Sequence, residues 1–104
     1  MNLKNDLDAR IAEAWKAHYA GRQEEAVQQF AQIAADIPDN IDAKWGLGLA
    51  YRKSGQRDNA LQVFQQVDQL LTAALETDSA DDRERFFMLK RMVKQQIEQM
   101  SEFI

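Results

Sequence analysis

The stretch Trp45-Gly46-Leu47-Gly48-Leu49-Ala50-Tyr51 decides the fold, together with three residues that follow it, Gly55, Ala60 and Phe64. Gly48 and Ala60 are small enough to let two helix backbones approach closely, while Tyr51 and Phe64 fill the space on either side of that contact. Gly55 suits the left-handed conformation that often ends a helix. These residues predict two antiparallel helices joined by a short turn.

The same pattern occurs earlier in the chain. A shift of 34 residues, the period of one kind of helix–turn–helix repeat, superimposes identical residues at the structural positions. The matched pairs are Asp8 with Asp42, Ala9 with Ala43, Gly21 with Gly55, Ala26 with Ala60, and Phe30 with Phe64. Several coincidences at one offset indicate that the hairpin is repeated, so the chain is expected to stack two copies of it.

These residues carry a family resemblance. Leu47, Gly48 and Tyr51, followed by Ala60 and Phe64, match the signature W-x2-L-G-x2-Y and then A-x3-F, so the segment resembles a tetratricopeptide repeat. The resemblance implies an all-α, right-handed α-solenoid in a single domain over residues 1–104. Its parts are expected to be repeat one at about 7–40, repeat two at about 41–74, and a long C-terminal capping helix at about 79–104.

Capping and breaking residues give the expected helix ends. Asp39 or Asn40 is placed to cap the third helix, and Ser79 to cap the last one. Pro38 disfavours helix at the residue before it and separates the repeats. Thr72 stands at the corresponding place in the second repeat, so the fourth helix is expected to run on past the end of its repeat.

Composition excludes several classes of protein. Of the 104 residues 45% are hydrophobic, which is ordinary for a folded chain, and one is proline. The absence of cysteine excludes a disulfide or a thiolate metal site. The formal net charge of −4 argues against nucleic acid as a partner. No apolar leader region or membrane-length apolar run is present, so we expect a cytoplasmic protein without membrane contact.

Nothing in the sequence indicates catalysis. The one histidine, His18, has no cysteine or second histidine to work with. No phosphate loop, nucleophile elbow or zinc motif is present either. We therefore expect a protein that is not an enzyme and that holds no cofactor and no metal.

The resemblance also implies a binding surface for a protein or peptide partner. In tetratricopeptide proteins the first helix of each repeat lines the concave face. Carried over to this chain, the lining residues are Ile11, Trp15, His18, Tyr19, Trp45, Leu49, Arg52 and Lys53.

Three aromatic residues of this surface need separate expectations. Trp45 is expected to be exposed in the groove, because its neighbours Leu47 and Tyr51 already take the core side. Trp15 lies in the first repeat, which matches the pattern less well. The sequence leaves two positions equally open for its side chain, one in the groove and one in the core. His18 is expected to be a partly exposed hydrogen-bonding residue rather than a pH switch.

The last helix offers a second surface. One stripe of it is expected to cover the second repeat, but its remaining apolar residues are more than a cap needs. This surplus consists of Phe87, Met88, Met92 and Phe103. It leads to an alternative hypothesis, in which the protein is a self-assembling unit that forms homo-oligomers through this helix. The basic residues of the same helix are expected to be solvated rather than bound to nucleic acid.

Overall fold

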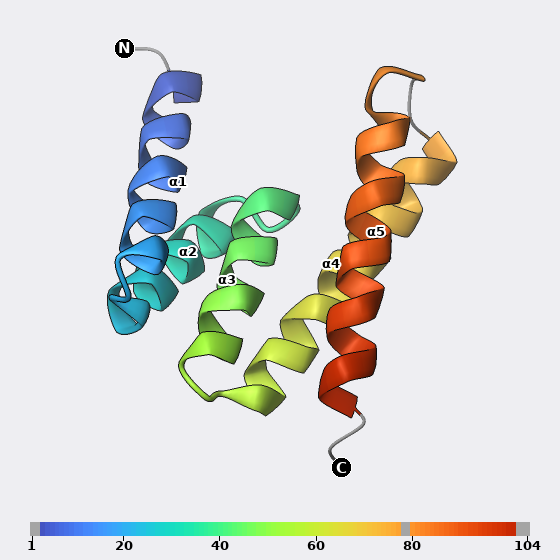
Figure 1. Ribbon diagram of the computed structural model, residues 1–104. Helices are drawn as coiled ribbons and strands as arrows, with labels where there is room; N and C mark the ends of the chain where they lie inside the picture. Colours follow the sequence, from blue (N-terminus) through green and yellow to red (C-terminus); the bar gives the residue numbers. More distant parts are fainter. Residues whose placement is uncertain (1–2, 78–79, 102–104) are drawn as a thin grey trace.

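The structure, a computed structural model, describes residues 3–77 and 80–101. Within these residues it contains five α-helices and no strand, so the predicted all-α solenoid of two hairpins with a long C-terminal helix is confirmed (Figure 1). The helices are α1 (Leu3–Tyr19), α2 (Gln23–Asp36), α3 (Ile41–Lys53), α4 (Arg57–Thr77) and α5 (Ala80–Ser101). In Figure 1 the hairpin α1–α2 forms one end of the molecule, and α4 with α5 forms the other.

The two hairpins turn in the same way. Gly21 (φ 84°) and Gly55 (φ 82°) both take the left-handed conformation directly after α1 and α3. In each turn two backbone N–H groups reach back to the preceding helix. The bonds are Gly21 N to His18 O (3.1 Å) with Arg22 N to Ala17 O (2.9 Å), and Gly55 N to Arg52 O (3.1 Å) with Gln56 N to Tyr51 O (2.9 Å). Both are Schellman motifs, and they recur 34 residues apart, so the repeat extends to the hydrogen bonds of the turn.

The other helix ends also follow from local chemistry. The Asn40 side chain accepts a hydrogen bond from the Ala43 backbone N–H (2.9 Å), so Asn40 is the cap of α3. α2 ends at Asp36, two residues before Pro38, whereas α4 continues to Thr77 as expected. The expected cap Ser79 lies outside the described residues.

α3 is held between α2 and α4 at two glycines. A Cβ atom added at Gly48 would meet three atoms of the Phe64 ring at 2.5–3.0 Å, and a Cβ at Gly46 would overlap the Phe30 ring more severely. Both rings are fully buried, so they have little room to move. The close approach inferred from Gly48 is therefore present, and Gly46 makes a second one toward the first repeat.

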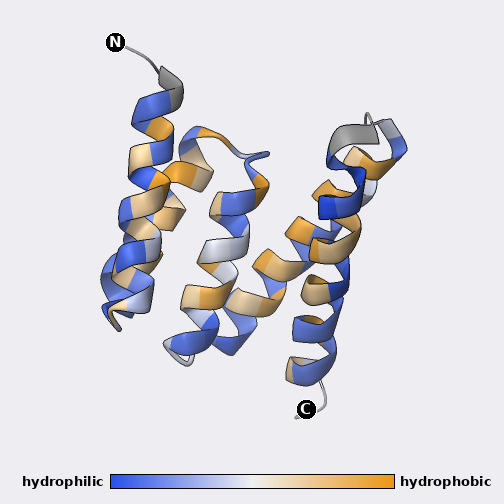
Figure 2. Ribbon diagram, turned by 45° about the horizontal axis from the view of Figure 1, so that its top comes forward, coloured by the Kyte–Doolittle hydropathy of each residue, from blue (hydrophilic) through white to orange (hydrophobic). Residues whose placement is uncertain are grey.

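The core runs through both hairpins and into the last helix. Its buried side chains come from all five helices and include Ala14, Ala17, Ala26, Phe30, Ala43, Ala60, Phe64, Val67, Leu71, Val93 and Met100. In Figure 2 hydrophobic residues recur along α4, which supplies much of this core and packs against both α3 and α5. The apolar stripe of α5 thus packs on the second hairpin, as expected.

Polar contacts fix α5 at several points along its length. Lys90 Nζ lies 2.9 Å from an Asp68 carboxylate oxygen and 2.7 Å from the Thr72 hydroxyl, both on α4. At the other end the Arg57 guanidinium donates to the Met100 carbonyl (Nε–O 3.0 Å), one of the carbonyls that a helix end leaves without a partner. The Arg52 guanidinium donates to Gln99 (3.2 Å) and so joins α3 to α5.

The substitution Gly48→Ala tests the close approach. In an ordinary helix this change stabilises by up to about 1 kcal/mol, but here the new methyl group meets the Phe64 ring. We expect Gly48→Ala to lower the free energy of unfolding by ~2 kcal/mol, the size of an overpacking penalty, measured by urea denaturation followed by circular dichroism.

The double variant Gly48→Ala with Phe64→Leu is the control. Because leucine vacates the space of the ring, adding Gly48→Ala to a Phe64→Leu background is expected to cost less than adding it to the natural chain. Equal costs in the two backgrounds would contradict the close approach of α3 to α4.

Candidate partner-binding groove

One flank of α3 lies next to α5. Its residues Asp42, Trp45, Leu49 and Arg52 follow each other at helical spacing of three or four. Two hollows border this flank, and side chains of α5 form a wall of each. We call these two hollows together the concave groove.

The first hollow lies beside the N-terminal half of α3. It encloses about 340 Å³ and is lined mainly by carbon atoms. The lining residues are Ile41, Asp42 and Trp45 from α3, and Arg85, Met88, Leu89 and Met92 from α5. An apolar floor with one carboxylate and one guanidinium at its edge is the composition of a site for an apolar side chain flanked by polar groups.

The second hollow lies at the C-terminal end of α3 and is more polar. It is lined by His18 from α1, by Leu49, Arg52 and Lys53 from α3, and by Gln96 from α5. Four of the eight residues expected to line the groove therefore meet here. The two cations of α3 give this end of the groove a positive charge.

The burial of Trp45 differs from the prediction. The residue lies on the predicted flank of α3, but only 9% of its surface is exposed, so the expectation of an exposed indole is wrong. Its ring packs 5.5 Å from the Phe64 ring, and α5 residues face it across the first hollow. The docked helix α5 covers this indole, and Trp45 contributes the floor of the hollow rather than a projecting anchor.

The aromatic residues of α1 lie close together at the groove. Trp15 is half-buried, with its ring edge-on to Phe30 at 5.0 Å and stacked on Tyr19 at 5.8 Å. The side chain of Trp15 is thus partly buried, between the two positions that the sequence left open. Tyr19 is 79% exposed. Ile11, also half-buried, lines neither hollow of the groove.

His18 acts as a hydrogen-bonding residue of the turn. Its ring Nδ1 lies 2.8 Å from Gln23 Oε1, and Gln23 Nε2 donates to the His18 carbonyl (2.7 Å). This reciprocal pair bridges the turn between α1 and α2. The expectation of a partly exposed, hydrogen-bonded histidine is confirmed.

Three of the four residues predicted for self-association, Phe87, Met88 and Met92, are exposed on α5. Met88 and Met92 are exposed (65% and 43%), but they line the first hollow of the groove. Phe87 lies about 100° from Met88 around the helix, and the Arg83 guanidinium covers its ring at 5.4 Å. Phe103 lies outside the described residues. Sequence reasoning missed that α5 forms a groove wall; the spacing of Arg85, Met88, Met92 and Gln96 was the available signal.

The Asp42 carboxylate lies at the first hollow, where neighbouring groups change its pKa. These groups remove the carboxylate partly from water, which raises its pKa above the usual 3.8. A hydrogen bond from the Trp15 side chain and the charge of Arg85 act in the opposite direction but are weaker. The protonated form is therefore favoured in the folded chain, and at neutral pH the charged Asp42 weakens folding.

The variant Asp42→Asn tests this burial. As the pH rises through 3.8 and on through the raised pKa, the unfolded state releases the proton first, so stability decreases. Asparagine removes this loss. We expect the melting temperature of Asp42→Asn minus that of the natural chain to become more positive between about pH 3 and about pH 7. A difference that stays constant or shrinks contradicts the desolvation of Asp42.

Two further structural findings concern the described residues alone. None of the helices over 3–77 and 80–101 is long and apolar enough to cross a membrane. The same residues contain no group of three or more His, Cys, Asp or Glu side chains placed to hold a metal ion.

Comparison with known proteins gives one family. Residues 4–88 match the family model described as the bacterial transcriptional activator domain. Searches of curated proteins and of solved structures gave no match. The matched model is not that of the tetratricopeptide repeat itself, so that resemblance holds at the coarser level of a related helical-repeat fold.

The match bears on two expectations. Its description names a regulatory domain and no reaction, in line with a protein that binds rather than catalyses. It also ties the family to transcription, so the expectation that nucleic acid is no partner finds no support. Because the model covers most of the sequence, from residue 4 to residue 88, the chain belongs to the bacterial transcriptional activator domain family.

Proposed function

We propose that this chain is a protein-interaction module of bacterial transcriptional activation, and that it holds a helix or peptide of a partner protein in the concave groove. The observation that carries the proposal is the first hollow, where Trp45 forms an apolar floor and the flexible side chains of Met88 and Met92 form a wall. Methionine adapts its shape to different apolar partners, which suits it to binding surfaces.

The two ends of the groove differ in chemistry, and this difference supports a directional partner. At one end an apolar side chain of the partner fits between Trp45 and Met92, with Asp42 and Arg85 beside it. At the other end Arg52 and Lys53 favour an acidic group. Trp45 and Lys53 are eight residues apart on α3, about 12 Å along its axis. The partner segment is therefore expected to carry an apolar and an acidic residue about that far apart.

Selection from a displayed library of random helical peptides tests the proposal. Peptides enriched on the natural chain are expected to bind with a Kd of ~10–100 μM, since the groove is short. Binding should weaken at least ~10-fold in Met92→Glu, because a charge enters the apolar wall. The matched control is Gln28→Glu, an exposed position on α2 outside both hollows, which should leave the Kd unchanged.

Methyl NMR of ¹³C-labelled methionine locates the bound peptide. The Met88 and Met92 methyl signals are expected to shift on binding, whereas that of Met100, buried in the core, should stay in place. Peptides that bind the natural chain and Met92→Glu equally, or that shift the Met100 signal alone, would contradict the groove as the binding site.

The alternative function is a structural unit that assembles with itself through α5. The exposed Phe87, Met88 and Met92 are the observation in its favour. Light-scattering mass across a dilution series separates the two functions. A mass that rises with concentration in the natural chain and stays monomeric in Met88→Glu supports self-assembly, and a constant monomer mass removes it.

A further inference from the structure

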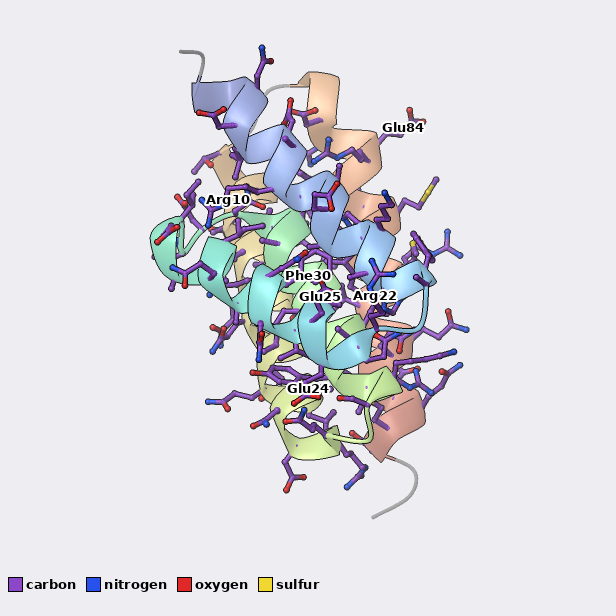
Figure 3. The ribbon with its side chains drawn as sticks, turned by 90° about the vertical axis from the view of Figure 1, so that its left-hand side faces the viewer. Arg10, Arg22, Glu24, Glu25, Phe30 and Glu84 are labelled. Carbon is purple, nitrogen blue, oxygen red and sulfur yellow. The ribbon has the colours of Figure 1, made fainter. Side chains whose placement is uncertain are left out.

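The outer face of the α1–α2 hairpin contains a hollow of its own. It encloses about 350 Å³ between the two helices and is lined mainly by carbon atoms. The lining residues are Ala9, Arg10 and Glu13 from α1, and Gln29, Gln32 and Ile33 from α2. Figure 3 looks onto this face, with α1 and α2 toward the viewer and Arg10 and Glu25 labelled. We call this surface the N-terminal edge.

The internal repeat identifies what kind of contact this surface is shaped for. Shifting the six lining residues by 34 positions gives Ala43, Lys44, Leu47, Val63, Gln66 and Val67. Four of these six are buried in the core of the molecule, Ala43 and Leu47 on α3 and Val63 and Val67 on α4. In the same core α2 packs against α3. The hollow is therefore the first hairpin's version of the face on which the second hairpin receives a preceding helix.

Gln29 is the first sign that this face has a missing partner. Its side-chain oxygen Oε1 is buried and has no hydrogen-bond partner within the described part of the chain. The amide nitrogen of the same side chain donates to Glu25 Oε1 (3.2 Å), which fixes the orientation of the amide, because a flip would place oxygen against a carboxylate. A buried acceptor without a donor is costly. Because the chain itself already covers Oε1, a donor from a docked partner would reach it only if the Gln29 side chain turned outward.

Charge gives the second sign. Asp6, Arg10 and Glu13 share one flank of α1 at helical spacing. Arg10 is already paired with Asp36 at 2.9 Å. Among the residues that the structure describes, no ion pair reaches Glu13. With the neighbouring charges included, Asp6, Glu13 and Asp36 against Arg10 and Lys16, the N-terminal edge and its surroundings carry an excess of one negative charge, which complements a basic partner.

We propose that the N-terminal edge docks a basic, amphipathic α-helix of a partner protein, seated against α1 as α2 is seated against α3. Small or apolar side chains of this helix fill the hollow over Ala9 and Ile33. One polar side chain donates a hydrogen bond to Gln29 Oε1, and a lysine or arginine meets Glu13. This surface does not depend on the concave groove, so it stands or falls separately from the proposed function.

A second copy of the chain fits this place poorly. The element needed at the edge is the equivalent of α2, and the other such helix of the chain, α4, already has α5 packed on it. The opposite end of the molecule thus presents α5, a helix with a different relation to its hairpin. Self-stacking is therefore an outcome for the experiment to detect and not the proposal.

Two labelled helical peptides serve as probes of the natural full-length chain. The first has the 14-residue sequence of α2, stapled to hold it helical. The second has Glu24, Glu25 and Asp36 of that sequence replaced by lysine. Because the edge is acidic, we expect fluorescence anisotropy to show that the lysine-bearing probe binds at least ~10-fold more tightly than the first.

Variants of the chain then locate the probe. Glu13→Gln is expected to weaken binding of the basic probe about fivefold. The control Glu24→Gln removes the same charge from an exposed position of α2 outside the hollow, and should leave binding unchanged. The side-chain amide signals of Gln29 are expected to shift on binding. Met92→Glu should have no effect, which separates this surface from the groove.

Several outcomes overturn the proposal. It fails if neither probe binds, if the two probes bind equally, or if Glu24→Gln weakens binding as much as Glu13→Gln. It also fails if the mass of the chain alone rises with concentration and Glu13→Gln abolishes that rise, because the occupant is then a second copy.

Discussion

The close contact of two glycines with two phenylalanine rings controls the rest of the structure. Gly46 and Gly48 are two positions apart and therefore lie on nearly opposite sides of α3. The Phe30 ring of α2 fills the space beside the first, and the Phe64 ring of α4 fills the space beside the second. This double contact sets the rotation of α3 about its own axis, which turns Asp42, Trp45 and Leu49 toward the concave groove. The orientation of the candidate groove thus follows from the packing of Gly46 and Gly48 against the two rings.

Local features were predictable because their causes are local. A glycine in the left-handed conformation, an asparagine cap and a proline break each depend on a few neighbouring residues, and the 34-residue recurrence of the glycine supported its prediction in both hairpins. The Schellman turns at Gly21 and Gly55 show why this works: the same hydrogen bonds require the same residue at the same place. Helical spacing places Trp45, Leu49 and Arg52 on one flank of α3, and the tetratricopeptide resemblance supplied the expectation that this flank lines a groove.

The burial of Trp45 was not predictable, because it depends on where α5 docks. That position is fixed by contacts with no regular spacing, such as Lys90 with Asp68 on α4 and the Arg57 guanidinium with the Met100 carbonyl. The apolar residues of α5 indicated that the helix packs and not which of its flanks lies over α3. For this reason Met88 and Met92 were assigned to a separate surface, although they face Trp45 across one hollow. Helical periodicity identifies a face, and only tertiary contacts identify its neighbour.

The N-terminal edge shows how one repeat is adapted to stand at the end of a stack. Leu47 and Val63 of the second hairpin correspond to Glu13 and Gln29 of the first, so the two central apolar positions of the stacking face have become polar at the edge. Exposed glutamate keeps the edge in water and disfavours indiscriminate apolar stacking, while the hollow beneath it keeps the shape of a helix seat. A helix with only apolar side chains can neither pair with the Glu13 carboxylate nor donate a hydrogen bond to the buried Gln29 oxygen. The proposed partner of this edge is therefore a helix that brings both a cation and a hydrogen-bond donor.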